Sequence, residues 1–302
     1  MKVKNVLKDI ARGAAIGTAC IVPGVSGGTI AIMLKIYDKI IGAVADFGKH
    51  FVKSLLTLLP IGIGVILALL ALWIPLNLAF EHLMFAIVSL FAGFIIGGIP
   101  GLVDEIKTEK VKPTYIIALV ISMLIVAFVG VASSLFGLDV SSMFVSPYPI
   151  YLYFILIPVG AIVAMALIVP GISGSMLLLV LGFYKPILGL VDELKDGGNI
   201  WEILLVLLCL VIGVLVGAIL CSLTMKKLLE KHKTITMYAI IGFVIGSIFS
   251  MFYNFEIVEY YQNILLWEWI VAPILLVVGT TLSYLLVVFE RKNTLKIKGK
   301  GE

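Results

Sequence analysis

The stretch Pro23-Gly24-Val25-Ser26-Gly27-Gly28-Thr29 recurs as Pro170-Gly171-Ile172-Ser173-Gly174-Ser175, and both copies lie inside otherwise apolar sequence. We refer to them as the first and the second motif. Proline lacks a backbone N–H and glycine favours conformations outside the helix, so each motif predicts a break in a helix. In lipid, backbone groups freed by such a break are tolerated only where protein or a water-filled cavity surrounds them. The doubled motif therefore predicts two broken helices that face a shared site.

Composition places the chain among polytopic membrane proteins. Of its 302 residues 62% are hydrophobic and 13% are charged, and the mean hydropathy is +1.19. These values exclude an ordinary soluble globular domain. Apolar stretches long enough to cross about 30 Å of hydrocarbon predict six full spans. We expect these spans at residues 54–74, 83–100, 114–137, 201–223, 235–253 and 268–289.

The apolar arm before the first motif, residues 13–22, is too short to cross a membrane, since it would span about 15 Å as a helix. We therefore expect the arms at 13–22 and 28–44 to form a re-entrant hairpin that turns near mid-depth and returns. The arms of the second motif, 150–169 and 172–191, are long enough to span, so that hairpin is assigned by analogy. Residues 1–12 are basic, but their apolar continuation leads into a repeated motif, so we expect them to belong to the mature fold rather than to a signal peptide.

The similarity between the two parts of the chain extends beyond the motifs. At an offset of 147 residues Gly13 matches Gly160 and Tyr37 matches Tyr184, and at an offset of 149 the segment around Gly93 matches that around Gly242. We therefore divide one integral membrane domain into a first repeat, 1–147, and a second repeat, 148–302.

Lysine and arginine collect in cytoplasmic loops and so predict the orientation. Eighteen of the 22 fall in the predicted inner segments, whereas the outer segments hold only Lys195, so both termini are expected to be cytoplasmic. Three spans separate the hairpins, and this odd number inverts the second half. The predicted fold is an all-α polytopic membrane protein of two inverted repeats, each a broken-helix hairpin plus three transmembrane helices, a layout found in alternating-access transporters. The inner segments are 1–12, 42–53, 101–113, 224–234 and 290–302, and the outer ones are 75–82, 138–149, 192–200 and 254–267.

Hydrolysis is the first chemistry to consider, because the first motif fits the G-x-S-x-G pattern of serine hydrolases. A serine nucleophile needs a base, and the three histidines, His50, His82 and His232, all fall in predicted loops. The sequence also holds no H-E-x-x-H, Walker motif or acidic metal cluster. We therefore expect no enzyme, no metal site and no cofactor.

Anion binding suits the same residues better. A Gly-rich turn offers backbone N–H groups at close approach, and small hydroxyl side chains add donors. The alternative is that the turns only let the hairpins pack tightly. Arg12, eleven residues before Pro23, is expected to assist an anion that enters from the cytoplasm, the alternative being an ordinary basic anchor. The predicted phosphate-binding residues are Ser26, Gly27, Gly28, Thr29, Ser173, Gly174, Ser175 and Arg12, with Pro23, Gly24, Pro170 and Gly171 forming the turns.

The two motifs, with the segment Gly97-Gly98-Ile99-Pro100-Gly101, resemble the PopT-like family of polyprenyl-phosphate (undecaprenyl phosphate) transporters, formerly a domain of unknown function. The resemblance covers essentially the whole chain. It implies a bacterial or archaeal cytoplasmic-membrane flippase that translocates undecaprenyl phosphate, the lipid carrier of cell-wall polymer synthesis, for recycling by alternating access. The second motif has Ser175-Met176 where the first has Gly28-Thr29, so the two half-sites need not bind equally.

The expected partners are the polyprenyl-phosphate lipid and the membrane, and no nucleic acid. The runner-up function is a transporter or channel for a small inorganic or organic anion, because the turns alone do not distinguish a lipid phosphate from a soluble one. The sequence leaves the coupling ion, the direction of net transport, the preferred polyprenyl length and the oligomeric state open.

Overall fold

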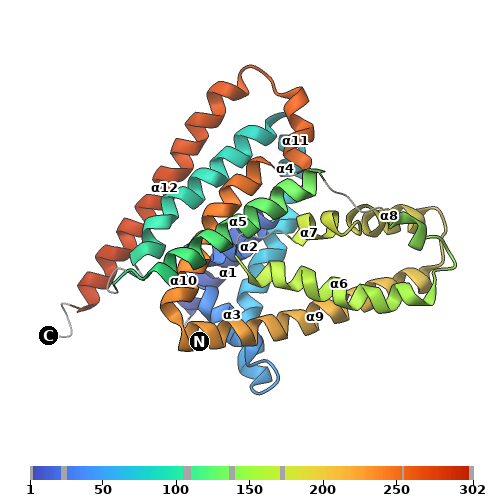
Figure 1. Cartoon of the computed structure of the whole chain (residues 1–302), viewed down its shortest axis with the longest axis horizontal. Coiled ribbons are helices and arrows are strands. Elements are labelled where there is room, and N and C mark those ends of the chain that lie inside the picture. The colour runs from blue at the N-terminus through green and yellow to red at the C-terminus, as the bar shows by residue number, and fades with distance from the viewer. Residues whose placement is uncertain are drawn as a thin grey trace.

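The computed structural model describes residues 3–21, 26–104, 106, 110–135, 140–170, 174–253 and 255–298. Over these residues the chain is helical and contains no strand (Figure 1). Six helical segments are long and apolar enough to cross a membrane, which confirms a multi-pass membrane protein with the six predicted spans. These segments are Phe51–Leu72, Leu83–Asp104, Pro113–Ala132, Ile200–Lys231, Lys233–Tyr260 and Glu268–Phe289.

At each motif one long helix ends and a short helix begins, followed by a second short helix. Both long helices have 19 residues and both helices that follow directly have 7. The same order of elements therefore occurs around both motifs. In chain order these helices are α1 (Val3–Ile21), α2 (Gly27–Met33) and α3 (Tyr37–Ala45), then α6 (Ile150–Ile168), α7 (Gly174–Val180) and α8 (Tyr184–Lys195).

The arms of the first hairpin differ from the prediction. Helix α1 already includes Val3, so the predicted start at residue 13 is wrong, and its 19 residues give a length of about 28 Å. The charged residues Lys8 and Arg12 lie four residues apart, which places them on one face of α1 and lets the helix continue. The returning arm is divided between α2 and α3, where Lys35 adopts a left-handed conformation with φ 53°.

The predicted loop at 75–82 is also wrong. Helix α4 (Phe51–Asp104) continues through these residues and is kinked at Leu83, with φ −137° and ψ 16°. The element consists of two helical parts joined across this kink, and each part holds one candidate span, Phe51–Leu72 or Leu83–Asp104. The stretch after Pro75 contains good helix formers, which carry the helix on to the kink. At 224–234 the connection is a single residue, His232, between α9 (Ile200–Lys231) and α10 (Lys233–Phe252), rather than a loop.

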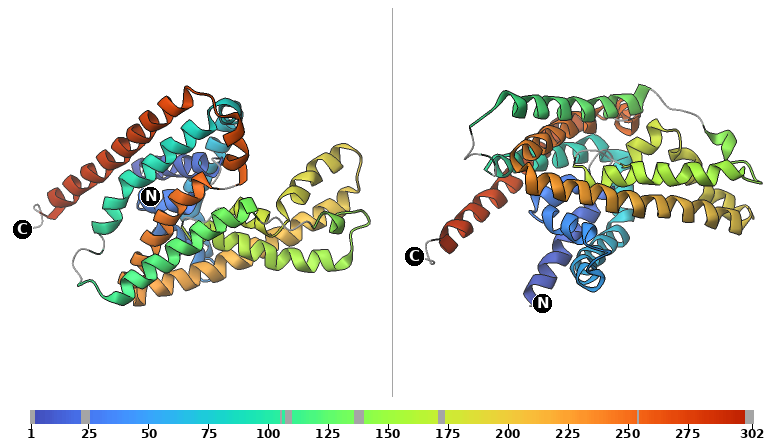
Figure 2. Two further views of the ribbon diagram at one scale, coloured as in Figure 1. Left: turned by 45° about the horizontal axis from the view of Figure 1, so that its top comes forward. Right: turned by 60° about the horizontal axis from the view of Figure 1, so that its bottom comes forward.

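Four helix pairs account for most of the packing. α1 packs on the first span of α4, and α6 packs on α9. The second span of α4 packs on α12 (Glu268–Lys298), and α10 packs on α5 (Pro113–Leu135). The first two pairs lie within one predicted repeat each, whereas the last two join the repeats. Figure 1 shows α12 beside α4 at one side of the molecule and α6 beside α9 at the other, and both views in Figure 2 keep this arrangement.

Glycines set the closeness of these pairs. A Cβ atom added to Gly93 of α4 would overlap the carbonyl oxygen of Leu276 in α12. At the matched position of the other repeat, a Cβ on Gly242 of α10 would overlap the carbonyl oxygen of Leu119 in α5. Small residues at membrane helix crossings allow such backbone approach. Gly13 and Gly160 make equivalent contacts on Ile61 and Leu210, so glycines that match in sequence also match in packing.

Three short elements remain among the described residues. They are the 3₁₀ turns Ser141–Met143 and Tyr261–Asn263 and the short helix α11 (Phe255–Tyr260). The main apolar core lies where α2, α3, α4 and α10 meet, and its fully buried side chains include Ile36, Ile41, Ile95 and Ile240. This core fixes the position of α2, which carries the described part of the first motif.

Candidate functional site

The first motif presents two buried hydroxyl groups without partners. Ser26 precedes α2 in an extended conformation, and its carbonyl oxygen accepts a hydrogen bond from Ile30 N at 3.3 Å. The side chains of Ser26 and Thr29 are 3% and 0% exposed, and among the described residues neither hydroxyl has a hydrogen-bond partner. Leaving such a group unpaired costs about 1–3 kcal/mol, so buried hydroxyls are normally bonded. These two hydroxyls are candidates for bonding a ligand.

Helix α2 runs back along α1. A Cβ atom added to Gly27 would lie 3.0 Å from Cys20 Sγ and 3.2 Å from Ile16 Cγ2, near the end of α1. At its other end α2 reaches Arg12, which lines a cavity together with Leu34. Seven helical residues span about 10 Å, so Leu34 lies roughly that far from the N-terminal end of α2. Arg12 therefore lines the cavity at the C-terminal end of α2, whereas Ser26 directly precedes its N-terminal end.

The second motif repeats part of this geometry. Gly174 begins α7, and a Cβ atom there would lie 3.4 Å from Val163 Cγ1 of α6. Gly174 follows Val163 by eleven residues, as Gly27 follows Ile16, so each short helix closes onto the equivalent position of its long helix. Pro170 and Gly28 are buried, and Ser175 lies in α7. Pro23, Gly24, Gly171 and Ser173 lie outside the described residues.

A buried hydrogen bond joins the first hairpin to the second. Tyr37 at the start of α3 donates its hydroxyl proton to the carbonyl oxygen of Ile168, at 2.7 Å. Ile168 ends α6 two residues before Pro170, so this bond satisfies a backbone group freed by the helix break. Sequence reasoning noted Tyr37 only as the match of Tyr184 and missed this contact. A tyrosine at the same distance after both motifs was the available signal.

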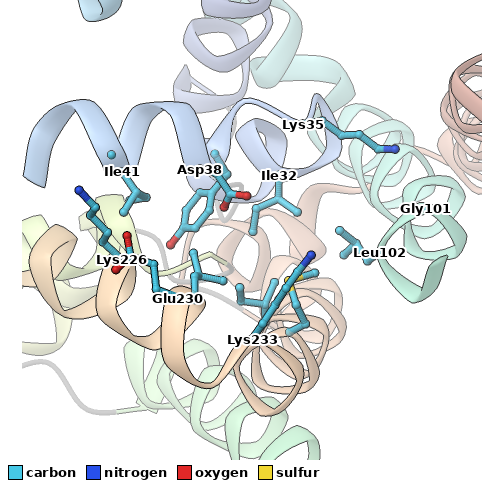
Figure 3. Close-up of a pocket in the computed structure, with 14 residues that line it drawn as sticks. Ile32, Lys35, Asp38, Ile41, Gly101, Leu102, Lys226, Glu230 and Lys233 are labelled. Atoms are coloured by element: carbon cyan, nitrogen blue, oxygen red, sulfur yellow. The ribbon is translucent and has the colours of Figure 1, made fainter. Parts of the chain in front are cut away.

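A cavity of about 400 Å³ opens where α2, α3, α4, α9 and α10 meet (Figure 3). Ile32, Leu102 and Ile240 give it an apolar lining. Its charged residues come from both halves of the chain, and no motif marks them: two fall in the predicted returning arm 28–44 and three in the predicted inner segment 224–234. They are Lys35, Asp38, Lys226, Glu230 and Lys233.

One ion pair beside this cavity links α3 to α9. Lys226 Nζ donates to both carboxylate oxygens of Asp46 at 2.8 Å. This hydrogen bond is the main cause that holds the pKa of Asp46 below its usual value. The pair connects the C-terminal end of α3 to α9, two elements that are far apart in the sequence.

Comparisons with known proteins agree in pointing to one family. A family model described as undecaprenyl phosphate translocase-like matches residues 16–265, which include both motifs. A protein of Staphylococcus aureus (strain NCTC 8325 / PS 47) named polyprenyl-phosphate transporter is 33% identical over 283 residues, or 91% of this chain and 94% of the relative. A protein of Vibrio cholerae serotype O1 (strain ATCC 39315 / El Tor Inaba N16961) with the same name is 29% identical over 267 residues, or 82% and 78%.

No solved structure matches this chain. The family match covers far more than half of the residues, and the Staphylococcus aureus relative is similar over nearly its whole length. This similarity confirms the predicted resemblance. The chain belongs to the undecaprenyl phosphate translocase-like family.

Proposed function

We propose that this protein transports polyprenyl phosphate across the cytoplasmic membrane and returns undecaprenyl phosphate to the inner leaflet for reuse in cell-wall polymer synthesis. The observation that carries the proposal is similarity over most of the chain to two proteins named polyprenyl-phosphate transporter. The six candidate spans suit a substrate that is itself a membrane lipid. The relatives are named transporters, which is compatible with a protein that is not an enzyme.

The proposed phosphate site in the first repeat consists of Ser26, Gly27, Gly28 and Thr29. Its support is the pair of buried hydroxyls that have no partner among the described residues. Phosphate oxygens are strong acceptors, and a hydrogen bond to a charged group contributes about 1.5–3 kcal/mol. Hiding the headgroup charge at mid-depth requires such donors, because a charge in the bilayer centre is costly. The equivalent residues of the second repeat are Ser173, Gly174 and Ser175.

The two repeats are proposed to have inverted topology, with both termini in the cytoplasm. Three observations support this: the matched order of elements around the motifs, the matched glycine contacts and the three candidate spans between the hairpins. The lysine and arginine distribution supports the orientation. One hairpin would then be reached from each side of the membrane, so that the two motifs act in turn on the same headgroup.

Alternating access is proposed to move the hairpins rather than whole repeats. The pairs formed by α4 with α12 and by α5 with α10 join the two repeats through glycine contacts. Rocking one repeat against the other would separate both of these close interfaces. These interfaces stay intact if the hairpins, together with the helices packed on them, move against the four helical segments of the two pairs. The bonds of Tyr37 and Asp46 across the repeats are the contacts that such a movement has to break.

The test is a leaflet-specific transport assay in proteoliposomes. Fluorescent undecaprenyl phosphate is placed in the inner leaflet, and a phosphatase added outside cleaves only the headgroups that reach the outer leaflet. We expect cleavage well above that of protein-free liposomes. Movement no faster than in protein-free liposomes would contradict the proposal. Uptake of labelled inorganic phosphate without movement of the lipid would instead favour a small-anion transporter.

A further inference from the structure

A second cavity, of about 330 Å³, lies between α1, the C-terminal end of α2 and the C-terminal part of α12. α1 packs on the first span of α4 and α12 packs on its second span, so the cavity lies between two helices that share one neighbour. We call this cavity the α1–α12 groove. The residues that matter for its chemistry are Lys8, Arg12, Met33, Leu34, Leu286 and Phe289.

One end of the α1–α12 groove is cationic. Lys8 and Arg12 lie four residues apart on α1, and no acidic side chain in the described part of the chain lines the groove. Arg12 Nη1 is 3.8 Å from Asp9 Oδ1, and the buried Asp9 also pairs with Lys39 of α3. Asp9 therefore neutralises only one of its two partners, and Lys8 adds a further positive charge. A phosphate monoester carries about −1.5 to −2 at neutral pH, which complements this surplus.

The rest of the groove is apolar and faces the lipid. Leu286 and Phe289 line it and are 48% and 63% exposed. Both lie near the C-terminal end of the candidate span Glu268–Phe289, where exposed apolar surface suits acyl chains close to the headgroups. A volume of about 330 Å³ is at the small end of ligand sites, which run from about 300 to 1,000 Å³. The groove therefore suits a headgroup with a short length of hydrocarbon, while a longer tail remains in the bilayer.

The inner end of the groove meets α2. Met33 extends against Gly98 of α4, where a Cβ atom would overlap the Met33 sulfur and lie 3.3 Å from Ser283 Oγ of α12. Gly98 thus makes room for the Met33 side chain, which lines the groove. From Met33, α2 leads over about 10 Å to the buried hydroxyl of Ser26.

We propose that the α1–α12 groove is the lateral loading site for polyprenyl phosphate. The headgroup lies between Lys8 and Arg12, and the first isoprene units lie against Leu34, Leu286 and Phe289. This inference rests on the proposed function for the identity of the lipid. It gives Arg12 a role at the entrance, separate from the phosphate site at Ser26.

The test is photocrosslinking of the full-length chain in proteoliposomes. Leu286 is replaced by p-benzoylphenylalanine, and radiolabelled undecaprenyl phosphate is titrated in before irradiation. We expect saturable labelling that unlabelled undecaprenyl phosphate competes away and undecaprenol, which lacks the phosphate, does not. The matched control places the same photoreactive residue at Leu285, which is 57% exposed and does not line the groove. Labelling there is expected to rise without saturation, as it does for bulk lipid.

The charge requirement is tested with Lys8→Gln and Arg12→Gln in the crosslinking protein. Each is expected to weaken apparent binding about tenfold, whereas Arg12→Lys retains most of it. Labelling that is equal at positions 285 and 286, or that is unchanged by both glutamine substitutions, would overturn the inference. Saturable labelling at 286 without transport in liposomes would support the groove and contradict the proposed function. Transport without saturable labelling at position 286 would support the proposed function and contradict the groove as the loading site.

Discussion

Removing the hydroxyls of Ser26 and Thr29 is expected to weaken substrate binding without lowering the stability of the fold. Both groups are buried and lack a partner among the described residues, and an unpaired buried hydroxyl costs about 1–3 kcal/mol. Ser26→Ala and the nearly isosteric Thr29→Val are therefore expected to leave the free energy of unfolding unchanged or raise it by about 1 kcal/mol. Each variant also loses a donor to phosphate, which weakens substrate affinity by about 10- to 100-fold.

The assay combines thermal unfolding in detergent with the Kd for undecaprenyl phosphate. Ser89 supplies the control, because it is also buried on a helix but its hydroxyl donates to Phe85 O at 2.8 Å. Ser89→Ala is expected to lower stability by about 1 kcal/mol and to leave substrate affinity unchanged. If Ser26→Ala and Thr29→Val instead behave like the control, the hydroxyls only support the packing of the hairpin, and the assignment of the site is wrong.

Three further predictions concern the links between helices. Tyr37→Phe leaves the carbonyl oxygen of Ile168 unpaired and is expected to lower the free energy of unfolding by about 1–3 kcal/mol. Denaturant titration measures this change, and an unchanged midpoint would show that water replaces the bond. Gly93→Ala forces α4 away from α12 and is expected to lower the free energy of unfolding by about 1–3 kcal/mol. Gly62→Ala, which has no atom near its added methyl group, is the control and is expected to be tolerated. Equal melting temperatures for the two variants would contradict the packing of α4 on α12. Lys226 lowers the pKa of Asp46, so the stability that this pair adds is fully present above the usual aspartate pKa of about 3.9. It is lost as the pH falls through the lower pKa of the folded state. In unfolding curves measured over a pH series, Asp46→Asn is expected to remove this loss.

The sequence was most informative about the spans and the helix breaks. Length and apolarity alone predict six spans, and proline with glycine predicts where the helices around the motifs end. The connections were harder to predict. At 75–82 a helix continues where the apolar pattern predicted a connection between two spans, because Pro75 interrupts the hydrogen-bond ladder without ending a helix whose neighbours are good helix formers.

The candidate site could be predicted only where one segment of chain supplies it. Ser26 and Thr29 belong to a repeated motif, so the sequence identified them before their burial was known. The Tyr37 bond to Ile168 depends on two segments 131 residues apart, and the groove charges come from a helix predicted to start after Arg12. Such contacts depend on tertiary packing, on which a single sequence gives no distance information.

Whether the two motifs bind the phosphate is decided by the leaflet-specific transport assay with the double variant Ser26→Ala/Ser173→Ala. Wild-type protein and the double variant are reconstituted at equal density, and the rate at which fluorescent undecaprenyl phosphate changes leaflet is compared with that of protein-free liposomes. The account predicts rapid movement for the wild type and a rate at least about tenfold lower for the double variant, since each motif loses a donor to the phosphate. Equal rates for the two proteins would contradict the assignment of the motifs as the phosphate sites, and no movement by the wild type would contradict transport itself.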